Sequence, residues 1–395
     1  MIDELIIDSF AGGGGASLGI AWATGRSPDI AINHDADAIK MHTANHPDTL
    51  HLSKGSDGMK TSVKNLPLFH ATRFGAVEER DALAALRMLD SKSVDLIFGS
   101  PPYEAQRRYN GEPGVTSLTG EAWVSWMLEI YAEATRVSRG LVAFVVNGFT
   151  KDFENSATPF MLVADLKRMQ TCKRCGRRVS LRSRSIDPFC VCDPWPGLIT
   201  PTFRVRKPPI FARWGTPGSG GPDWLRDNYE LIVCATSRDV VKLPYGEPTA
   251  IGEPPRYAAG GVATNRTKSD KRTRAKKYAK PKLANPGNVR WHKVGGGLMG
   301  SHYAHENEAP FPQSLAREFV LMFCPPGGTV CDPFSGSGTT AAAAVLAGRR
   351  YLCFDARASQ VELSNRRIGE AIGELDMRAT FAGARQQLKE NPENE

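Results

Sequence analysis

The sequence has no hydrophobic run long enough to cross a membrane. A spanning helix needs roughly 20 consecutive apolar residues, and no stretch of the chain approaches that length. The N-terminal residues, MIDELIIDSF, lack the basic segment that opens a secretory signal. With 41% hydrophobic and 23% charged residues, the composition is that of an ordinary globular protein. We therefore expect a cytoplasmic protein that has no membrane partner.

Outside one segment, the chain has little net charge. Residues 266–282 (RTKSDKRTRAKKYAKPK) contain nine Lys or Arg and one Asp, and this surplus of eight equals the net charge of +8 of the whole chain. Such a run suits a solvated linker. It also suits a loop that follows nucleic-acid phosphates, because clustered cations release counterions when they bind a polyanion.

Cysteine is sparse, and its eight residues fall into two groups. One group lies in apolar runs and is expected to fill the core with small side chains: Cys234, Cys324, Cys331 and Cys353. The other forms a C-x2-C and a C-x-C pair around a short basic segment: Cys172, Cys175, Cys190 and Cys192. Four thiolates at this spacing suit a tetrahedral structural zinc, although the second pair is tighter than usual. Unliganded or redox-active thiols are the alternative.

Apolar runs alternate with helical patterns along most of the chain, which predicts a Rossmann-like α/β fold. The polar stretch at 50–80 is not assigned by its pattern, and residues 237–300, rich in Gly, Pro, Lys and Arg, cannot build a large core of their own. Strands are expected at 5–10, 29–33, 93–99, 141–147, 230–236, 329–334 and 351–355, and helices at 16–25, 35–46, 121–137, 158–169, 312–324, 339–348 and 359–372.

The stretch TVCDPFSGSGTT, residues 329–340, carries the first chemical signal. A strand that ends in Asp332 is followed by a glycine-rich turn and by a helix that begins near Thr339. Such a turn lets the backbone approach a ligand closely at the switch point of an α/β sheet. Asp355, at the end of the next strand, can accept hydrogen bonds from ribose hydroxyls, as acids do at that point of dinucleotide folds.

The second signal is the sequence SPPY at the end of an expected buried strand. Two consecutive prolines end the strand and hold a rigid, extended backbone. The Ser100 hydroxyl and a backbone carbonyl can then accept hydrogen bonds from a planar amino group, while the ring that carries this group stacks on Tyr103. A plain turn that ends a strand is the alternative.

Together, GSPPY and the later EAPFPQSLAREFVLMFCPPGGTVCDPFSGSGTTAAAAVLAGRRYLCFDA closely resemble the DNA amino-methyltransferases, which methylate cytosine N4 or adenine N6 with S-adenosylmethionine. The resemblance covers roughly residues 90–375, and the order of the motifs matches the β group of that family. It implies a Rossmann-like, S-adenosylmethionine-dependent methyltransferase fold with an inserted target-recognition region. The cysteine spacing adds a small zinc knuckle to this expectation.

The resemblance also implies roles for individual residues. Those expected to hold the target amine are Ser100, Pro101, Pro102 and Tyr103; those expected to line the cofactor site are Phe311, Asp332, Pro333, Phe334, Gly336, Gly338, Thr339 and Asp355. The lone pair of the amine is delocalised into its ring. Hydrogen bonds from its N–H groups to Ser100 Oγ and the Pro101 carbonyl would pull the nitrogen towards sp3 before it attacks the sulfonium methyl in line. The base must leave the duplex, and Tyr103 offers it a stacking surface.

The opening stretch DSFAGGGGASLGI, with AINHDADAIKMHTANHPDT after it, resembles the start of the C5-cytosine methyltransferases, which use the same cofactor. That family attacks cytosine with a cysteine in a Pro-Cys dipeptide, and this chain contains no Pro-Cys. We interpret the segment as an appended half-domain. Two alternatives stay open: a second cofactor pocket, or an N-terminal turn that is the working one beside a purely structural DPFSGSGTT.

The predicted function is site-specific methylation of double-stranded DNA by an enzyme of a phage or of a restriction–modification system. The resemblance favours cytosine N4, because Ser at the first position of SPPY is more typical of the N4-cytosine enzymes of that family and Asp of the N6-adenine ones. Adenine N6 is the alternative, followed by RNA methylation or non-catalytic DNA binding. A homodimer and a restriction partner stay open. The expected parts are a half-Rossmann extension at 1–80, a catalytic part at 90–170, a Cys-rich knuckle at 171–200, a core continuation at 201–236, a basic target-recognition region at 237–305, a cofactor-binding part at 306–375 and a tail at 376–395.

Overall fold

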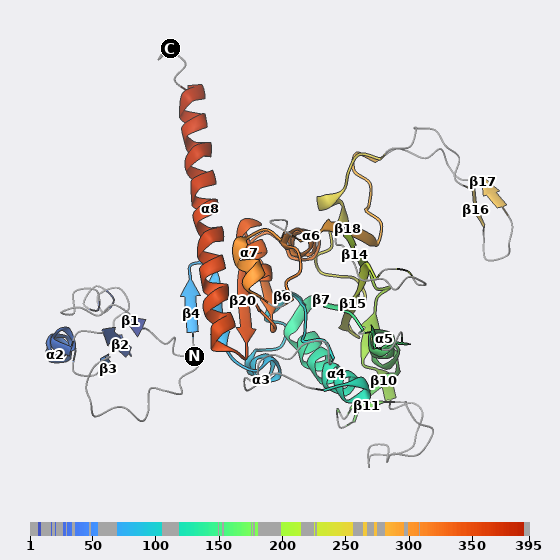
Figure 1. Cartoon of the computed structure of the whole chain (residues 1–395), viewed down its shortest axis with the longest axis horizontal. Coiled ribbons are helices and arrows are strands. Elements are labelled where there is room, and N and C mark those ends of the chain that lie inside the picture. The colour runs from blue at the N-terminus through green and yellow to red at the C-terminus, as the bar shows by residue number, and fades with distance from the viewer. Residues whose placement is uncertain are drawn as a thin grey trace. The chain divides into compact units, whose positions relative to one another are not determined.

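The chain forms two compact units, residues 1–66 and residues 67–395 (Figure 1). The structure is a computed structural model that describes residues 7–8, 17, 20, 27–28, 30–33, 36–46, 49–53, 69–104, 118–148, 150–151, 154–174, 176, 178–180, 199–214, 225, 227–255, 264–266, 272–274, 281–295, 299–307 and 309–390. In this part of the chain, no helix combines the length and the apolar character needed to cross a membrane.

The first unit contains three short parallel strands, β1 (Ile7–Asp8), β2 (Ile30–Asn33) and β3 (Leu50–Ser53), in that spatial order. Helix α2 (Ala36–Asn45) connects β2 with β3. The strand and helix expected at 29–46 are therefore confirmed. The glycine-rich turn at 11–15, on which the predicted resemblance to C5 enzymes depends, lies outside the described residues.

The second unit is built on a ten-stranded mixed sheet in the order β18-β14-β15-β7-β6-β19-β20-β5-β4, with β13 also paired to β15. Five neighbouring strands, from β7 to β5, are parallel, and β15 runs antiparallel to β7 and β14. The strands are β4 (Phe69–Thr72), β5 (Gly75–Glu79), β6 (Val94–Gly99), β7 (Ser138–Val146), β13 (Phe203–Val205), β14 (Ile210–Trp214), β15 (Tyr229–Ser237), β18 (Val289–Lys293), β19 (Thr329–Asp332) and β20 (Arg350–Asp355).

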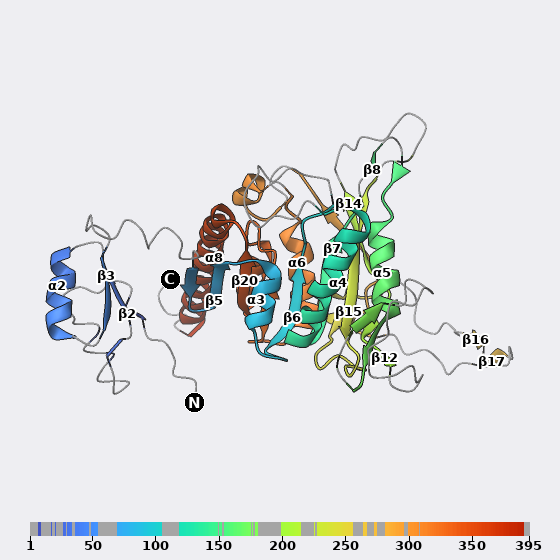
Figure 2. The ribbon, with the colours of Figure 1, turned by 90° about the horizontal axis from the view of Figure 1, so that it is seen from below.

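Helices cover both faces of this sheet. One face packs against α3 (Ala82–Met88), α4 (Gly120–Val137) and α5 (Thr158–Arg168), and the other against α6 (Gln313–Phe323), α7 (Thr339–Leu346) and α8 (Ala358–Glu390). Figure 1 shows α3 and α4 on one side of the central strands and α6 and α7 on the other, and Figure 2, seen from below, shows α3 and α4 in front of these strands. Strand β7 is buried on both faces of the sheet, because successive side chains of a strand point to opposite faces. Ala143 and Val145 belong to the core under α6, α7 and α8, and Val142 and Phe144 belong to the core under α3, α4 and α5.

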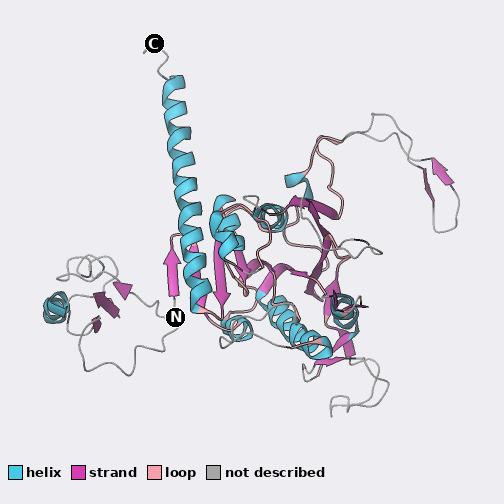
Figure 3. Ribbon diagram, viewed as in Figure 1, coloured by secondary structure: helices cyan, strands magenta, loops and turns pink. Residues whose placement is uncertain are grey.

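Two findings differ from the sequence expectations. Residues 69–79, which the prediction grouped with the N-terminal extension, form β4 and β5 in the large sheet, where β5 pairs with β20. The hydrophobic pattern of β5 is weak because only Val77 of its sequence GAVEE is fully buried. The last helix was expected to end at 372, but α8 continues as one helix to Glu390, as Figure 3 shows.

The Cys-rich segment begins and ends in a small sheet of β10 (Met169–Cys172), β11 (Arg178–Ser180) and β12 (Ile199–Pro201), in the order β11-β10-β12. Cys172 is paired with Ile199, so the chain leaves and re-enters the fold at one place. Cys172 is buried, whereas the other three cysteines of this group lie outside the described residues. Among the described residues, no cluster of three or more His, Cys, Asp or Glu could hold a metal.

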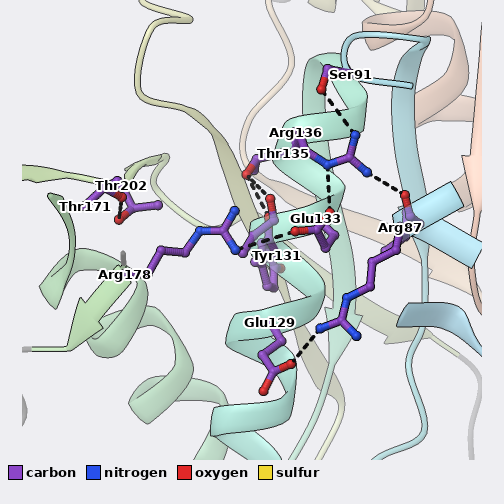
Figure 4. A network of polar contacts seen from close by, with 12 residues as sticks. Arg87, Ser91, Glu129, Tyr131, Glu133, Thr135, Arg136, Thr171, Arg178 and Thr202 are labelled. Atoms are coloured by element: carbon purple, nitrogen blue, oxygen red, sulfur yellow. Dashed lines mark hydrogen bonds and ion pairs between the residues drawn. The ribbon is translucent and has the colours of Figure 1, made fainter. Parts of the chain in front are cut away.

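A polar network around α4 joins this small sheet and α3 to the core, as seen in Figure 4. Arg136 donates to the Leu86 and Leu89 carbonyls at the end of α3, at 2.8 Å each, and to Glu133 at 2.7 Å. Arg178 of β11 forms an ion pair with Glu133 at 3.6 Å. Arg136 therefore ties α4 to α3, and Glu133 ties it to β11.

The remaining described elements are short: β8 (Thr150–Lys151), β9 (Glu154–Asn155), β16 (Thr264–Arg266), β17 (Arg272–Arg274) and the 3-10 helices η2 (Pro248–Ile251) and η3 (His302–Glu306). The four cysteines expected in the core, Cys234, Cys324, Cys331 and Cys353, are buried, which confirms that prediction.

Candidate functional site

The carboxyl ends of three neighbouring parallel strands, β6, β19 and β20, meet at one edge of the sheet and line a pocket. Ten of the twelve residues predicted for catalysis and cofactor binding line it: Ser100, Pro101, Pro102, Tyr103, Phe311, Pro333, Phe334, Gly336, Thr339 and Asp355. Sequence segments more than 200 residues apart therefore share this pocket, because parallel strands in this order place their ends side by side.

The glycine turn between β19 and α7 has the backbone that its sequence predicts. Gly336 and Gly338 have φ angles of 51° and 75°, in the left-handed region that favours glycine. A Cβ atom at Gly336 would lie 2.8 Å from Asn307 Nδ2. The amide of Gly336 donates to Asp355 Oδ2 at 2.9 Å, and this bond fixes the turn against the end of β20.

Asp332 lies buried beneath the turn and does not line the pocket. Its Oδ1 accepts a hydrogen bond from the Phe334 amide at 2.9 Å. Burial raises the pKa of the Asp332 carboxyl to about 7, and the nearby Asp355 carboxylate adds to this rise. A Cβ atom at Gly99 would lie 2.1 Å from Asp332 Oδ1, so β6 and β19 approach this closely only because residue 99 has no side chain.

Helix α8 supports the turn from behind with two residues that sequence reasoning missed. The Ser364 hydroxyl donates to the Gly336 carbonyl at 2.7 Å. The buried Arg367 guanidinium donates to the hydroxyls of Ser337 and Thr339, at 3.0 and 2.7 Å. It also donates to the Met299 carbonyl and to Gln313 Oε1, at 3.1 and 2.9 Å, so Arg367 links the turn to the segment that leads into α6.

The SPPY segment is anchored from several sides. The Trp123 indole donates to the Pro102 carbonyl at 2.8 Å. The buried Glu104 carboxylate accepts hydrogen bonds from the Gly120 amide and the Thr158 hydroxyl, both at 2.6 Å, at the first turns of α4 and α5. These bonds hold the segment rigidly at the end of β6.

The Ser100 hydroxyl donates its hydrogen to the Val145 carbonyl at 3.1 Å, since a carbonyl oxygen only accepts. Its lone pairs therefore remain available as acceptors. The Tyr103 hydroxyl donates to Glu230 Oε2 at 2.7 Å. Burial, and then the Glu230 carboxylate, raise the pKa of Tyr103 well above its usual value, so this phenol stays protonated and keeps that bond.

A second pocket lies on the far side of SPPY. It shares five lining residues with the first: Ser100, Tyr103, Ala309, Pro310 and Phe311. Its polar wall contains Glu230 and Arg213, whose Nη1 and Oε1 atoms are 3.4 Å apart. Within the described part of the chain, the buried Arg213 Nε has no hydrogen-bond partner. The two pockets therefore meet at the Ser100–Tyr103 segment.

Two predicted residues, Asp332 and Gly338, support the turn without lining either pocket. Residues that the sequence pattern did not reveal are also present. Asp81 follows β5 and caps α3 by accepting from the amides of Leu83 and Ala84, at 3.0 Å each, and it lines the first pocket. Its signal was the Asp that precedes ALAALRM, a typical N-cap just after the unassigned stretch at 50–80.

Comparisons with known proteins agree with this geometry. The DNA methylase family of N6 and N4 enzymes matches residues 94–366. The chain is similar to the DNA adenine methyltransferase YhdJ of Escherichia coli (strain K12), with 24% identity over 307 residues that cover 76% of this chain and 86% of the relative. It is also similar to the type II methyltransferase M.Cfr9I of Citrobacter freundii, with 25% identity over 311 residues, or 74% and 87% of the two chains.

Among solved structures, the cytosine-N4-specific PvuII DNA methyltransferase aligns with a TM-score of 0.49 and 17% identity, over 75% of this chain and 86% of the other. The family match spans more than half of the sequence and includes both SPPY and the glycine turn. This chain therefore belongs to the N6/N4 DNA methylases and is an S-adenosylmethionine-dependent DNA amino-methyltransferase.

Proposed function

We propose that this enzyme transfers the methyl group to N4 of a cytosine that has left the duplex and entered the second pocket. The observation that carries the proposal is the junction of the two pockets at Ser100 and Tyr103. A methyl donor in the first pocket and an amine in the second would face each other across that segment, as an in-line displacement requires.

The first pocket offers groups that fit S-adenosylmethionine. The turn at Gly336 leaves a cradle that a side chain would fill, since a Cβ there would meet Asn307. The Asp355 carboxylate accepts hydrogen bonds from the amides of Gly336 and Arg357, at 2.9 and 3.1 Å. Asp355 lines this pocket, and a carboxylate only accepts hydrogen bonds, which suits the donor hydroxyls of a ribose. The aromatic rings of Trp126 and Phe334 add apolar walls.

When bound, S-adenosylmethionine supplies an electrophilic methyl group on a sulfonium. The protein then has to orient the amine and make its lone pair available. Ser100 has lone pairs to accept one amine N–H, and the Pro101 carbonyl is the proposed second acceptor. The Tyr103 ring, fixed by its bond to Glu230, is the proposed stacking surface for the flipped base.

Cytosine is favoured by the second pocket as well as by the Ser at the start of SPPY. On its Watson–Crick edge, cytosine presents two acceptors, O2 and N3, beside its amine, whereas adenine presents one, N1, on that edge. Arg213 lines this pocket, and its guanidinium is held by the Glu230 carboxylate at 3.4 Å and by the Asp227 carbonyl at 3.0 Å. A guanidinium is a planar fork of donors, which suits the cytosine edge. Adenine N6 is the second candidate because YhdJ, to which the chain is similar, is named as an adenine methyltransferase.

Nucleoside mass spectrometry of unmethylated double-stranded DNA, incubated with the protein and S-adenosylmethionine, tests this function. We expect N4-methylcytosine. N6-methyladenine would replace the proposal by its second candidate. The absence of a methylated base, from protein shown to be folded and to bind the cofactor, would contradict it.

A pair of serine variants provides the control. Ser100→Ala should reduce single-turnover methyl transfer by on the order of 100-fold, the scale typical of a lost transition-state hydrogen bond. Ser125→Ala should leave the rate unchanged, because its hydroxyl bonds only the Glu121 carbonyl on the exposed face of α4. Equal rates in the two variants would remove Ser100 from the chemistry.

We further propose that the Cys-rich segment holds a structural zinc through Cys172, Cys175, Cys190 and Cys192. The support is their spacing and the pairing of β10 with β12, which closes this segment at its base. Metal analysis of the purified protein should find about one zinc per chain by the tetrathiolate rule. Stably folded protein without metal would remove the knuckle.

A further inference from the structure

Three strands at one side of the sheet, β15, β14 and β18, carry exposed aromatic residues on the face opposite the second pocket. Neighbouring residues of a strand point to opposite faces. Arg213 and Glu230 line the pocket on one face, so Trp214 and Tyr229, which follow and precede them in the chain, lie on the other face.

The strand register places four side chains together on that face. Ala212 is paired with Tyr229 on one side and with Trp291 on the other, and Trp214 is paired with Lys293. Lys293 Nζ lies 5.4 Å from the centre of the Trp214 ring. We call Tyr229, Trp214, Trp291 and Lys293 the aromatic strip.

The aromatic strip is open to solvent. Trp214 is 58%, Trp291 59% and Tyr229 42% exposed. The core on this face of the sheet, which α3, α4 and α5 cover, includes Phe203, Val233 and Ala235 of β13 and β15 but no residue of β14 or β18. Large aromatic side chains normally contribute their area to a core or an interface, and a contiguous exposed group of them marks a binding surface.

The surroundings indicate a nucleic acid. The aromatic strip lies at the end of the strands where β6 leads into SPPY. The N-terminal end of β15 pairs with the C-terminal end of β7. Because β14 runs antiparallel to β15 and parallel to β18, the C-terminal ends of β14 and β18 lie at that same end of the sheet. The aromatic strip therefore lies at the same end of the strands as the proposed base pocket, on the opposite face of the sheet. Aromatic rings beside a cation suit unpaired nucleotides, because the rings stack on the face of the base and the cation pairs with the phosphate.

We propose that the aromatic strip receives unstacked nucleotides of the DNA strand that contains the target base, where this strand passes around the end of the sheet from the second pocket. This inference rests on the proposed function for the position of the target base. The strip would hold neighbouring nucleotides by stacking on Trp214 and Trp291, with Lys293 near the phosphates. Its contribution is to DNA affinity and not to the methyl-transfer step.

Tryptophan fluorescence titration with a short single-stranded DNA oligonucleotide tests the inference. Wild-type protein should show quenching, and the double variant Trp214→Ala/Trp291→Ala should bind at least about fivefold more weakly, the lower end of the effect of losing one stacked base. The double variant Trp214→Phe/Trp291→Phe keeps two rings and should retain most of the affinity, read by competition. Phe160→Ala, which removes an exposed aromatic ring on α5, is the control and should bind like wild type.

Steady-state methylation separates the aromatic strip from the catalytic site. The alanine double variant should raise KM for DNA and leave kcat and cofactor affinity unchanged. Unchanged DNA binding in the double variant would overturn the inference. The inference would also be overturned if the wild-type protein is a dimer, the double variant is a monomer and DNA binding persists in the variant, because the aromatic strip would then be a protein interface. DNA-dependent quenching that needs the strip, without any methylated base, would instead contradict the proposed function alone.

Discussion

Asp332 is an acidic residue in surroundings that disfavour its charge. It is buried beneath the glycine turn, against Gly99, and its pKa is raised to about 7 from 3.8. A raised pKa means that the folded state binds a proton that the unfolded state has already released. The resulting stability is fully present below about pH 4 and is lost as the pH rises through about 7.

We therefore expect the Asp332→Asn variant to gain folding stability relative to wild type as the pH rises from 5 to 7. The difference in the free energy of unfolding should grow by up to about 1.4 kcal/mol per pH unit and then level off. The asparagine keeps an oxygen for the Phe334 amide, so the turn should be retained. Urea unfolding of both proteins across this pH range measures the effect, and parallel curves would show that the carboxyl is not perturbed.

Glu230 is a positioning residue because it holds the hydroxyl of Tyr103 and lines only the second pocket. Glu230→Ala should lower the single-turnover rate by roughly 10- to 100-fold, since a catalytic group misplaced by about 1 Å can cost 100-fold. Cofactor affinity should not change. Glu230→Gln, which retains an acceptor for Tyr103, should recover most of the rate.

Glu129→Ala is the matched control, because this exposed carboxylate pairs only weakly with Arg87 at 3.4 Å. If the role of Glu230 is purely structural, Glu230→Ala should lower the melting temperature and reduce the methyl-transfer rate and the cofactor affinity together.

At the scale of elements, helix α8 does more than cover the sheet. Its Arg367 joins the glycine turn, the segment at Met299 and the start of α6 through four hydrogen bonds. Burial lowers the pKa of this guanidinium to about 10, which leaves it charged at neutral pH. Three chain segments thus depend on one side chain for their mutual position.

Neighbouring arginines allow a direct test. Arg367→Met should cost on the order of 3 kcal/mol of unfolding free energy, because it leaves several buried acceptors unpaired, and it should weaken cofactor binding. Arg366→Met removes an exposed ion pair with Glu306 and a cation–π contact with Tyr303, and should change stability by only about 1 kcal/mol. Chemical unfolding and isothermal titration with S-adenosylmethionine give both quantities. Similar effects of the two substitutions would refute the role of Arg367.

At the scale of the whole molecule, the two units each carry a strand that ends in Asp before a glycine-rich sequence. The described pocket belongs to the second unit, between β20 and the turn after β19. We therefore expect Asp355→Ala to weaken S-adenosylmethionine binding at least about tenfold, through loss of a charge-assisted hydrogen bond. Asp8→Ala should leave binding unchanged. The reverse result would make the N-terminal turn the working one.

Local signals in the sequence determined the parts of the site that are contiguous in the chain. Two prolines after a buried run end β6 at SPPY, and the glycines of DPFSGSGTT place a turn before α7; both follow from the conformational limits of single residues. The helices at 121–137, 158–169 and 312–324 were readable for the same reason, since their periodic apolar residues lie close together in the chain.

Only the tertiary structure decided which distant residues complete the site. Glu230 contacts Tyr103 across 127 positions, and Asp81, Arg213 and Arg367 come from segments without a chemical motif of their own. Their places depend on the order and register of the sheet, which arise from long-range packing and leave no local trace. The weakly patterned β5 was missed for the same reason, because its partner β20 lies more than 270 residues away in the chain; β4 is held in the sheet through its pairing with β5.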